Sequence, residues 1–173
     1  MQAFMDSKNS YTKSEFNYIC IYNQTMADIF SIITRSDIMS KIRSKNTKPE
    51  NLVRKFLYDN GFRYRKNLKS LPSTPDIVIK KCRTVVLVNG CFWHGHENCK
   101  NFKMPKTRVE FWTEKIERNR KRDVESIEKL QRLGWDVVVI WECQLTPKKR
   151  KATLNALLDV LYKNLLEAVR VVQ

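Results

Sequence analysis

The chain has 173 residues, of which 42% are hydrophobic and 10% aromatic, a size and composition that suit one domain with a real core. This composition excludes a fully disordered basic tail. No apolar run approaches the roughly 20 residues of a membrane-spanning helix, and no cationic start leads into an apolar stretch with a cleavage site. We therefore expect a soluble, cytoplasmic protein with no membrane partner.

The positive charge is concentrated in the later part of the chain. Lys and Arg total 33 against 18 Asp and Glu, a net charge of +15. Residues 1–38 hold three basic and four acidic side chains, so residues 39–173 carry a balance of +16. Such a field favours a polyanionic partner, most simply nucleic acid, although a generically basic surface is the alternative.

Three segments are expected along the chain. Residues 1–34 mix polar side chains with short apolar groups and show no clean period, which predicts a weakly ordered extension. Residues 35–146 are expected to form the domain, and residues 147–173 a basic connector with an amphipathic helix packed on that domain. Five cysteines in a chain without an export signal favour metal ligation or buried thiols over a disulfide framework.

The first regular pattern follows Met39. Thr47 and Glu50 have the spacing of a capping box, and an apolar stripe follows at helical spacing. This predicts a helix that begins after Thr47 and that Gly61 ends. Alternation of apolar and basic side chains over Phe62–Arg65 then predicts a first strand.

Two further strands are predicted after a proline-containing turn. Asp76–Ile79 and Thr84–Val88 are apolar segments joined by a tight turn. Almost all residues of the second are β-branched, which is typical of a central strand buried on both sides. Residues 89–107 form a long loop that is dense in Cys, His and aromatic side chains. Loops of this length in compact domains are usually functional or held by a metal.

A long helix, a strand and a last helix complete the pattern. The helix Arg108–Leu133 ends at Gly134, the strand Trp135–Trp141 follows, and the basic connector Lys148–Lys151 leads to an amphipathic helix. This order of helices and strands indicates an α/β layer fold with a mixed sheet.

The strongest local signal is a group of cysteines and histidines after the strand Thr84–Val88. Cys91, His96 and Cys99 have the residue types and spacing of zinc ligands, and Cys143 could supply the fourth from the end of the next buried strand. This assignment leaves His94 free to take a proton from water. Alternatively, both histidines are ligands and Cys143 is idle, or all of these are free thiols and surface histidines.

Asp76 is the second signal, because it begins an apolar strand directly after a proline. One interpretation is a ligand for a divalent cation, as phosphodiester-cleaving nucleases require. The other is a turn-forming Asp that bonds its own backbone. Glu50 could join the same centre or merely complete the capping box, and its spacing favours the box.

Aromatic side chains interleaved with basic ones are the third signal. Phe92, Trp93 and Trp112 could stack on or wedge between the bases of a nucleic acid. The alternative is packing in the core, which Trp112 fits better because it lies at helical spacing with Ile116.

Residues 39–145 resemble the very short patch repair endonucleases. The matching stretches are residues 39–47 (MSKIRSKNT), 72–78 (PSTPDIV), 90–96 (GCFWHGH), 105–112 (PKTRVEFW) and 141–143 (WEC). The resemblance implies a restriction-endonuclease-like fold, a mixed sheet flanked by helices. It also implies a magnesium-dependent nick in one strand of double-stranded DNA, beside the T of a T·G mismatch left by deaminated 5-methylcytosine.

The resemblance also implies roles at the catalytic centre. Asp76 corresponds to the magnesium-binding carboxylate, and the backbone carbonyl of Val88 to a further metal contact. His94 corresponds to the general base, which leaves a 5′-phosphate, and Glu50 to an acidic residue that supports the centre. Asn89 stands where some members carry a second histidine; it cannot act as an acid or base near neutral pH, but it could donate a hydrogen bond to phosphate.

Further roles concern zinc and DNA. The family's structural zinc ligands correspond to Cys91, His96, Cys99 and Cys143. This closed site would hold rigid the loop that carries the general base. The residues that insert beside the mismatch correspond to Phe92, Trp93, Trp112 and, from the other groove, Met39. As partners the resemblance implies DNA with a T·G mismatch and mismatch-repair proteins, at the bacterial nucleoid.

The chain departs from the wider nuclease fold at the magnesium site and from some members of the narrower family at the zinc site. The strand Val86–Val88 lacks the acidic residue and lysine that ordinary members place there, so only its backbone could bind a cation. The spacing from His96 to Cys99 is one residue longer than in some relatives. Two other functions stay open, a zinc-stabilised DNA-binding module without catalysis and a site-specific nuclease of the same fold.

Overall fold

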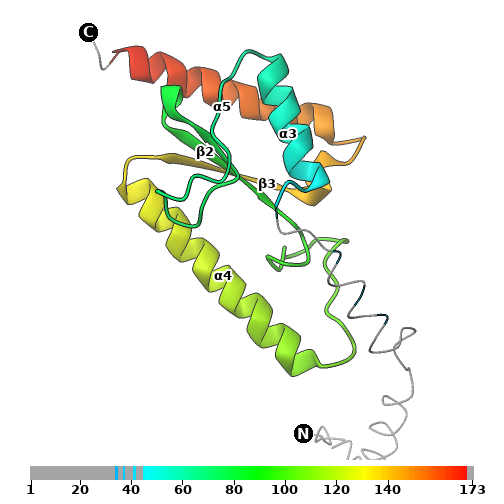
Figure 1. The fold of residues 1–173 in the computed structure, drawn as a ribbon. Coiled ribbons are helices and arrows are strands. Elements are labelled where there is room, and N and C mark those ends of the chain that lie inside the picture. Colours follow the sequence, from blue (N-terminus) through cyan, green and yellow to red (C-terminus); the bar gives the residue numbers. More distant parts are fainter. Residues whose placement is uncertain (1–33, 35–36, 38–40, 42–44, 171–173) are drawn as a thin grey trace, which may run out of the picture. The chain divides into compact units, whose positions relative to one another are not determined.

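The computed structural model describes residues 34, 37, 41 and 45–170 (Figure 1). The chain divides into two units, residues 1–42 and residues 43–173. In the first unit, Lys41 pairs with Asp37 at 2.7 Å. Met39 and all but one residue of the predicted extension 1–34 lie outside the described residues. The second unit contains the whole sheet and every candidate site residue except Met39.

A mixed three-stranded sheet forms the centre of the second unit. Its strands are β1 (Ile77–Ile79), β2 (Thr84–Asn89) and β3 (Asp136–Trp141), in the order β1-β2-β3. β2 pairs with β1 antiparallel and with β3 parallel. The short antiparallel step needs only the 3-10 turn η1 (Lys80–Cys82), whereas the parallel step requires a long crossover, which a helix provides. The predicted central position of the β-branched strand is confirmed.

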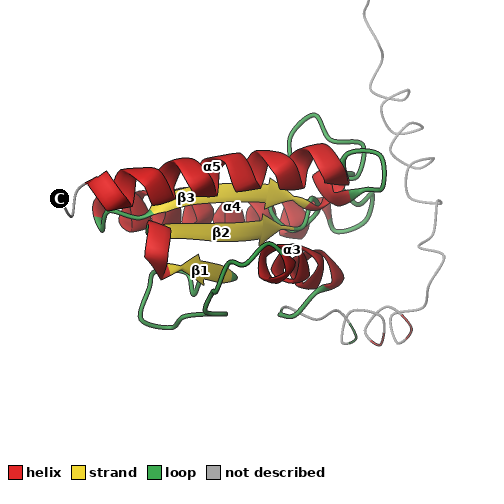
Figure 2. Ribbon diagram, turned by 90° about the horizontal axis from the view of Figure 1, so that it is seen from above, coloured by secondary structure: helices red, strands yellow, loops and turns green. Residues whose placement is uncertain are grey.

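Helices cover both faces of this sheet (Figures 1 and 2). α3 (Lys48–Asp59) and α5 (Arg150–Arg170) lie on one face, and α4 (Val109–Arg132) lies on the other. Successive strand residues point to opposite faces, so Val86 packs with Leu57 and Leu161, whereas Val85 packs with Leu130. The predicted α/β fold with a mixed sheet is confirmed.

Local sequence signals account for the ends of α3 and α4. Thr47 and Glu50 form the predicted capping box. The side chain of each residue accepts a hydrogen bond from the backbone N–H of the other. At the end of α4, Gly134 adopts a left-handed conformation with φ +75°, which turns the chain toward β3. Glycine adopts this conformation with little strain because it has no Cβ. Among the described residues, none of the helices combines the length and apolarity needed to cross a membrane.

The prediction of a strand over Phe62–Arg65 is wrong. Only Arg65 pairs there, in an isolated antiparallel bridge to Val78 with two hydrogen bonds of 2.9 Å. β1 has three residues, and the outer two are turned toward β2, so only Val78 offers backbone groups to another strand. β1 also begins one residue later than predicted, which leaves Asp76 outside the ladder. α5 begins at Arg150, within the segment predicted as a connector.

Candidate active site and metal centre

Asp76 lies where β1 begins, and its side chain reaches across to β2. Its Oδ2 accepts a hydrogen bond of 2.8 Å from the backbone N–H of Val88. In an extended strand the N–H and C=O of one residue point to the same side, so the Val88 carbonyl also faces Asp76. The pairing of β1 with β2 ends at Ile77 opposite Val86, so no residue of β1 donates a hydrogen bond to the Val88 carbonyl.

These groups suit a hard divalent cation. Among the residues that the structure describes, none donates a hydrogen bond to Oδ1 of Asp76, so that oxygen remains available. A carboxylate oxygen and a backbone carbonyl are ligands that Mg²⁺ accepts together with several waters. Burial raises the pKa of Asp76, and the hydrogen bond from Val88 offsets part of this rise. A bound cation would favour the ionised form further.

Glu50 lies close to Asp76 but is fully occupied by other partners. Its carboxylate pairs with Arg54 at 2.9 Å and accepts a hydrogen bond of 2.8 Å from the hydroxyl of Thr47. The side chains of Glu50 and Arg54 are each only 4% exposed. Arg54 also donates a 3.0 Å hydrogen bond to the backbone carbonyl of Asp76. The capping role that the spacing favoured is confirmed, and Arg54 ties the start of α3 to the candidate cation site.

His94 has a partner that the sequence pattern did not reveal. Its Nδ1 lies 2.5 Å from Oδ2 of Asp123 on α4, and both side chains are about three-quarters buried. When Nδ1 carries the proton and donates to Asp123, Nε2 keeps its lone pair and can accept a proton. Electrostatic interaction with His94 is a smaller influence on the pKa of Asp76 than burial and the Val88 hydrogen bond, and it indicates that the two side chains are near one another. The structure therefore brings a proton acceptor near the candidate cation site.

α4 holds the backbone on both sides of His94. Asn119 donates a 2.8 Å hydrogen bond to the carbonyl of Trp93, and Arg120 donates to the carbonyl of Gly95. Gly95 adopts φ +58°, and a Cβ there would lie only 2.6 Å from Ile116 Cγ2 on the same helix. Only glycine allows this close approach without a shift of the loop or of α4. The position of His94 thus depends on a rigid helix as well as on its own loop.

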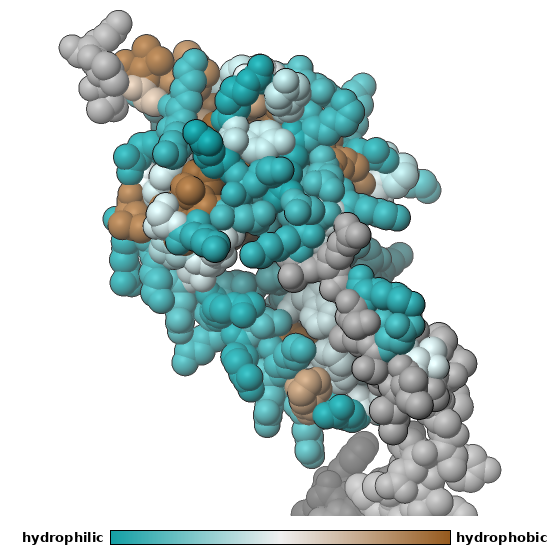
Figure 3. Space-filling view, in the orientation of Figure 1, coloured by the Kyte–Doolittle hydropathy of each residue, from teal (hydrophilic) through white to brown (hydrophobic). Residues whose placement is uncertain are grey.

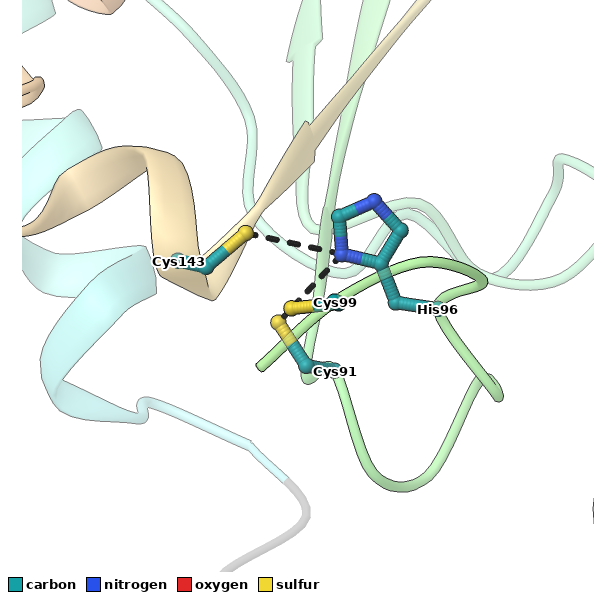
Figure 4. Close-up of side chains that lie close together, drawn as sticks. All are labelled: Cys91, His96, Cys99 and Cys143. Atoms are coloured by element: carbon teal, nitrogen blue, oxygen red, sulfur yellow. Dashed lines mark hydrogen bonds between the residues drawn. The ribbon is translucent and has the colours of Figure 1, made fainter. Parts of the chain in front are cut away.

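The four predicted zinc ligands come together in one group, Cys91, His96, Cys99 and Cys143 (Figure 4). Their ligand atoms all lie within 4.8 Å of one another. The cysteine far along the chain joins because β2 and β3 are parallel and Asn89 pairs with Trp141, so both strands end at the same edge. Cys143 follows in the 3-10 turn η2 (Glu142–Leu145).

The two separations from His96 to the cysteine sulfurs in this group match those between the ligands of tetrahedral zinc. His96 Nδ1 lies 3.6 Å from Cys91 Sγ and 3.5 Å from Cys143 Sγ, and zinc–ligand bonds of about 2.0–2.3 Å in a tetrahedron give ligand separations of about 3.5–3.8 Å. Burial raises the pKa of Cys91 to about 12, so its thiolate requires a compensating cation at neutral pH. The cluster can therefore hold a metal ion.

The two histidines have different surroundings. The ring of Trp141 stacks on His96, with centroids 3.9 Å apart and planes 3° apart, which fixes the imidazole orientation. His94 instead uses Nδ1 for Asp123. This division favours the assignment with Cys143 as the fourth ligand over the alternative with two histidine ligands.

The aromatic residues Phe92, Trp93 and Trp112 form one cluster between the loop and the start of α4. Ring centroids lie 5.1 Å apart for Phe92–Trp93 and 5.3 Å apart for Phe92–Trp112. Trp112 is 9% exposed, whereas Phe92 and Trp93 are half-buried. The ammonium of Lys115 lies 5.4–5.5 Å from the rings of Trp93, Phe111 and Trp112. The cluster places aromatic faces beside a cation, an arrangement compatible with base stacking.

Asn89, the last residue of β2, is 8% exposed and shares the α4-facing side of the strand with Val85 by alternation. Three functional candidates were missed by the sequence: Arg54, Asp123 and Asn119. Arg54 has a local signal, since it lies four residues after Glu50 on one helix. The other two lie on α4, 29 and 26 residues from their partners.

The fold and the site define an α/β protein with a candidate hydrolytic centre and, in addition, four residues that could hold a metal ion. The family model described as DNA mismatch endonuclease Vsr matches residues 27–101. The chain is 48% identical over 144 residues to the type II nicking enzyme V.NmeAIP of Neisseria meningitidis, a match that covers 83% of this chain and 100% of that protein.

Two other relatives extend this result. The type II nicking enzyme V.XorIIP of Xanthomonas oryzae is 46% identical over 121 residues, 70% of this chain and 88% of its own. The DNA mismatch endonuclease Vsr of Escherichia coli is 43% identical over 136 residues, 79% of this chain and 86% of its own. The chain therefore belongs to the Vsr family of DNA mismatch endonucleases, and the resemblance seen in the sequence is confirmed.

Proposed function

We propose that this protein is a magnesium-dependent DNA endonuclease that nicks one strand beside the T of a T·G mismatch. Membership of the Vsr family supports a DNA endonuclease. The observation that carries the chemistry is Asp76, whose carboxylate is held by the Val88 N–H with one oxygen left available. His94 is near enough to interact electrostatically with Asp76, and its contact with Asp123 through Nδ1 leaves Nε2 to accept a proton. A mixed sheet flanked by helices fits the restriction-endonuclease-like fold that the family implies.

Different residues of the site would bind the cation and accept the proton during hydrolysis. Asp76 and the carbonyl of Val88 would hold Mg²⁺, which supplies charge stabilisation at the scissile phosphate when bound. His94 Nε2 accepts the proton of the attacking water, and Asp123 keeps the imidazole in the required tautomer and orientation. The water oxygen bonds to phosphorus, the bond from phosphorus to the 3′-oxygen breaks, and the departing oxygen takes a proton from solvent water, which yields a 5′-phosphate and a 3′-hydroxyl.

Glu50 and Asn89 support this centre without carrying the proton. Glu50 is committed to Thr47 and Arg54, so its negative charge acts on Asp76 from outside the cation's coordination shell. Asn89 stands at the end of β2 directly before the loop of His94, and its amide is suited to donate to a phosphate oxygen.

Zinc has a structural role in this proposal. Four ligands leave no open position, as in structural sites, so the ion would connect the loop 91–99 with η2. This fixes His94 between the metal cluster and α4. Phe92 and Trp93 are carried by the same loop, and with Trp112 and Met39 they would insert beside the mismatch. A mismatched pair is easier to unstack than a matched one, which favours selection of T·G.

Partners and location follow from the substrate. The protein would act on double-stranded DNA at the bacterial nucleoid in the cytoplasm, together with mismatch-repair proteins. The names of the relatives leave one distinction to experiment: two are called type II nicking enzymes and one a mismatch endonuclease. A site-specific nicking enzyme that does not need a mismatch is therefore the second candidate.

One nicking experiment separates these functions. T·G and T·A duplexes in a panel of sequence contexts are incubated with protein and Mg²⁺, and the rate of single-strand cleavage is measured. We expect cleavage of T·G duplexes only, and loss of at least about 100-fold in Asp76→Asn. Asp136→Asn is the matched control, because Asp136 is an exposed carboxylate at the opposite edge of the sheet.

Each other outcome has a defined meaning. Equal cleavage of T·G and T·A duplexes would identify the site-specific nicking enzyme. DNA binding without Mg²⁺-dependent cleavage would identify the DNA-binding module. Full activity of Asp76→Asn would refute the proposed role of that carboxylate.

A further inference from the structure

A run of four cations begins at the end of the sheet where the candidate site lies. Lys148, Lys149, Arg150 and Lys151, hereafter the basic segment, follow η2 and enter α5. The two Lys before α5 and Lys151 are exposed, and Arg150 is half-buried. Figure 1 shows this start of α5, in orange, next to the end of β3.

The basic segment is anchored close to the metal cluster. Thr153 donates a 3.1 Å hydrogen bond from its hydroxyl to the carbonyl of Gln144, which joins the first turn of α5 to η2. The backbone N–H groups of Lys149 and Arg150 donate to the carbonyl of Thr146 at 3.0 and 2.8 Å, and the Thr146 hydroxyl donates a 3.2 Å hydrogen bond to the carbonyl of Cys143. The four cations therefore lie at the edge of the sheet that carries the zinc ligands and the end of β2, not at the opposite edge.

These cations are placed where they do not stabilise the fold. The start of a helix carries a partial positive charge, so cations there are repelled by the helix dipole. The first turn of α5 contains no acidic residue, and within the described part of the chain no carboxylate forms an ion pair with any of the four. On the other helices and later in α5, several exposed cations are paired at i,i+4, among them Lys55–Asp59, Arg132–Glu128 and Lys163–Glu167.

A partner with regularly spaced negative charges would relieve this repulsion. Each strand of duplex DNA carries one phosphate for about every 3.4 Å of helix axis, so flexible adjacent lysines can contact successive phosphates. Hydrophilic side chains cover most of the face shown in Figure 3, which suits a wet, polar contact. We infer that the basic segment binds the phosphate backbone of the substrate duplex beside the nicking site, an inference that rests on the proposed function.

This contact has a defined consequence for recognition. Phosphate contacts fix the register of a protein on the duplex but carry no base information. The basic segment therefore strengthens binding to T·G and T·A duplexes by the same factor. Discrimination between the duplexes is left to the aromatic residues of the loop.

The test is the salt dependence of DNA binding without Mg²⁺, measured with a fluorescent duplex on the full-length protein. In Lys148→Gln/Lys149→Gln, we expect the slope of log K against log salt to fall by about 1.8, since each phosphate contact contributes about 0.9. T·G and T·A affinities should fall equally. The matched control is Lys80→Gln/Lys81→Gln, which removes two exposed lysines from η1 at the opposite edge of the sheet and should leave the slope nearly unchanged.

Stability measurements exclude a folding artefact. Removing cations that repel the start of a helix should leave the melting temperature equal or slightly higher, so weaker DNA binding cannot arise from unfolding. The inference is overturned if the slope is unchanged, or if both double variants lower it equally. If the wild-type protein binds neither duplex, it is the proposed function that fails.

Discussion

Replacing Cys143 by Ser tests whether the metal cluster connects two distant parts of the chain. Cys143 reaches the cluster from η2, and the chain between it and Cys91 spans about 50 residues. For a cross-link that closes a loop of this length, the chain-entropy relation gives a stabilisation of about 4 kcal/mol. In a domain of this size, that loss lowers the melting temperature by about 10–15 °C. Zinc content should fall from about one ion per chain to well below it.

The measurements are metal analysis by mass spectrometry and thermal unfolding on the same preparation. Cys82→Ser is the matched control, because Cys82 is a buried thiol outside the cluster and should keep its zinc. We also expect Cys143→Ser to nick DNA poorly, since the loop that carries His94 loses its tie to η2. A variant with full zinc content and unchanged melting temperature would refute the four-ligand assignment.

Three further predictions concern the active-site loop and its neighbours. Phe92→Ala/Trp93→Ala should lower the ratio of T·G to T·A nicking rates by about 5- to 150-fold while zinc content is retained; an unchanged ratio in the folded variant contradicts insertion of these rings. Because burial raises the pKa of Asp76, the carboxyl group keeps its proton to a higher pH in the native state than in the unfolded chain. The free energy of unfolding therefore falls as the pH rises from the unfolded-state pKa to the native-state pKa. Asp76→Asn should therefore be more stable than wild type at pH 7 in magnesium-free buffer. Denaturant titrations should show that this difference in the free energy of unfolding shrinks as the pH is lowered toward 3.8, the ordinary pKa of the carboxyl group. Gly95→Ala should lose about 1–3 kcal/mol and most nicking activity, whereas Gly61→Ala, at φ +83° with nothing within 4 Å of the added carbon, should lose stability from backbone strain alone and keep its activity.

The order and direction of the strands explain why the site residues lie together. Two parallel strands end at one edge, so the residues that follow them are neighbours in space although they are far apart in sequence. Asp76 belongs to the same region because β1 is short and antiparallel and begins where β2 still continues. This edge of the sheet therefore brings together a carboxylate, the Val88 carbonyl and the four residues that could hold a metal ion.

Features that depend on neighbouring residues could be predicted from the sequence alone. The capping box of α3 follows from Thr47 and Glu50 three residues apart, and the central position of β2 follows from its continuous β-branched residues. The grouping of Cys91, His96 and Cys99 was predicted from residue types and spacing, and Cys143 was expected to join it because it follows the next buried strand.

The tertiary structure decided which distant side chains meet, and here the sequence had no equivalent signal. Asp123 faces His94 because of the angle at which α4 packs and the close approach of Ile116 to Gly95. The predicted strand Phe62–Arg65 reduces to one bridge because β1 offers only one outward-facing residue. Spacing along a helix or strand is set by backbone geometry and can be read locally, whereas the rotation of a helix against a sheet is set by the packing of the whole core.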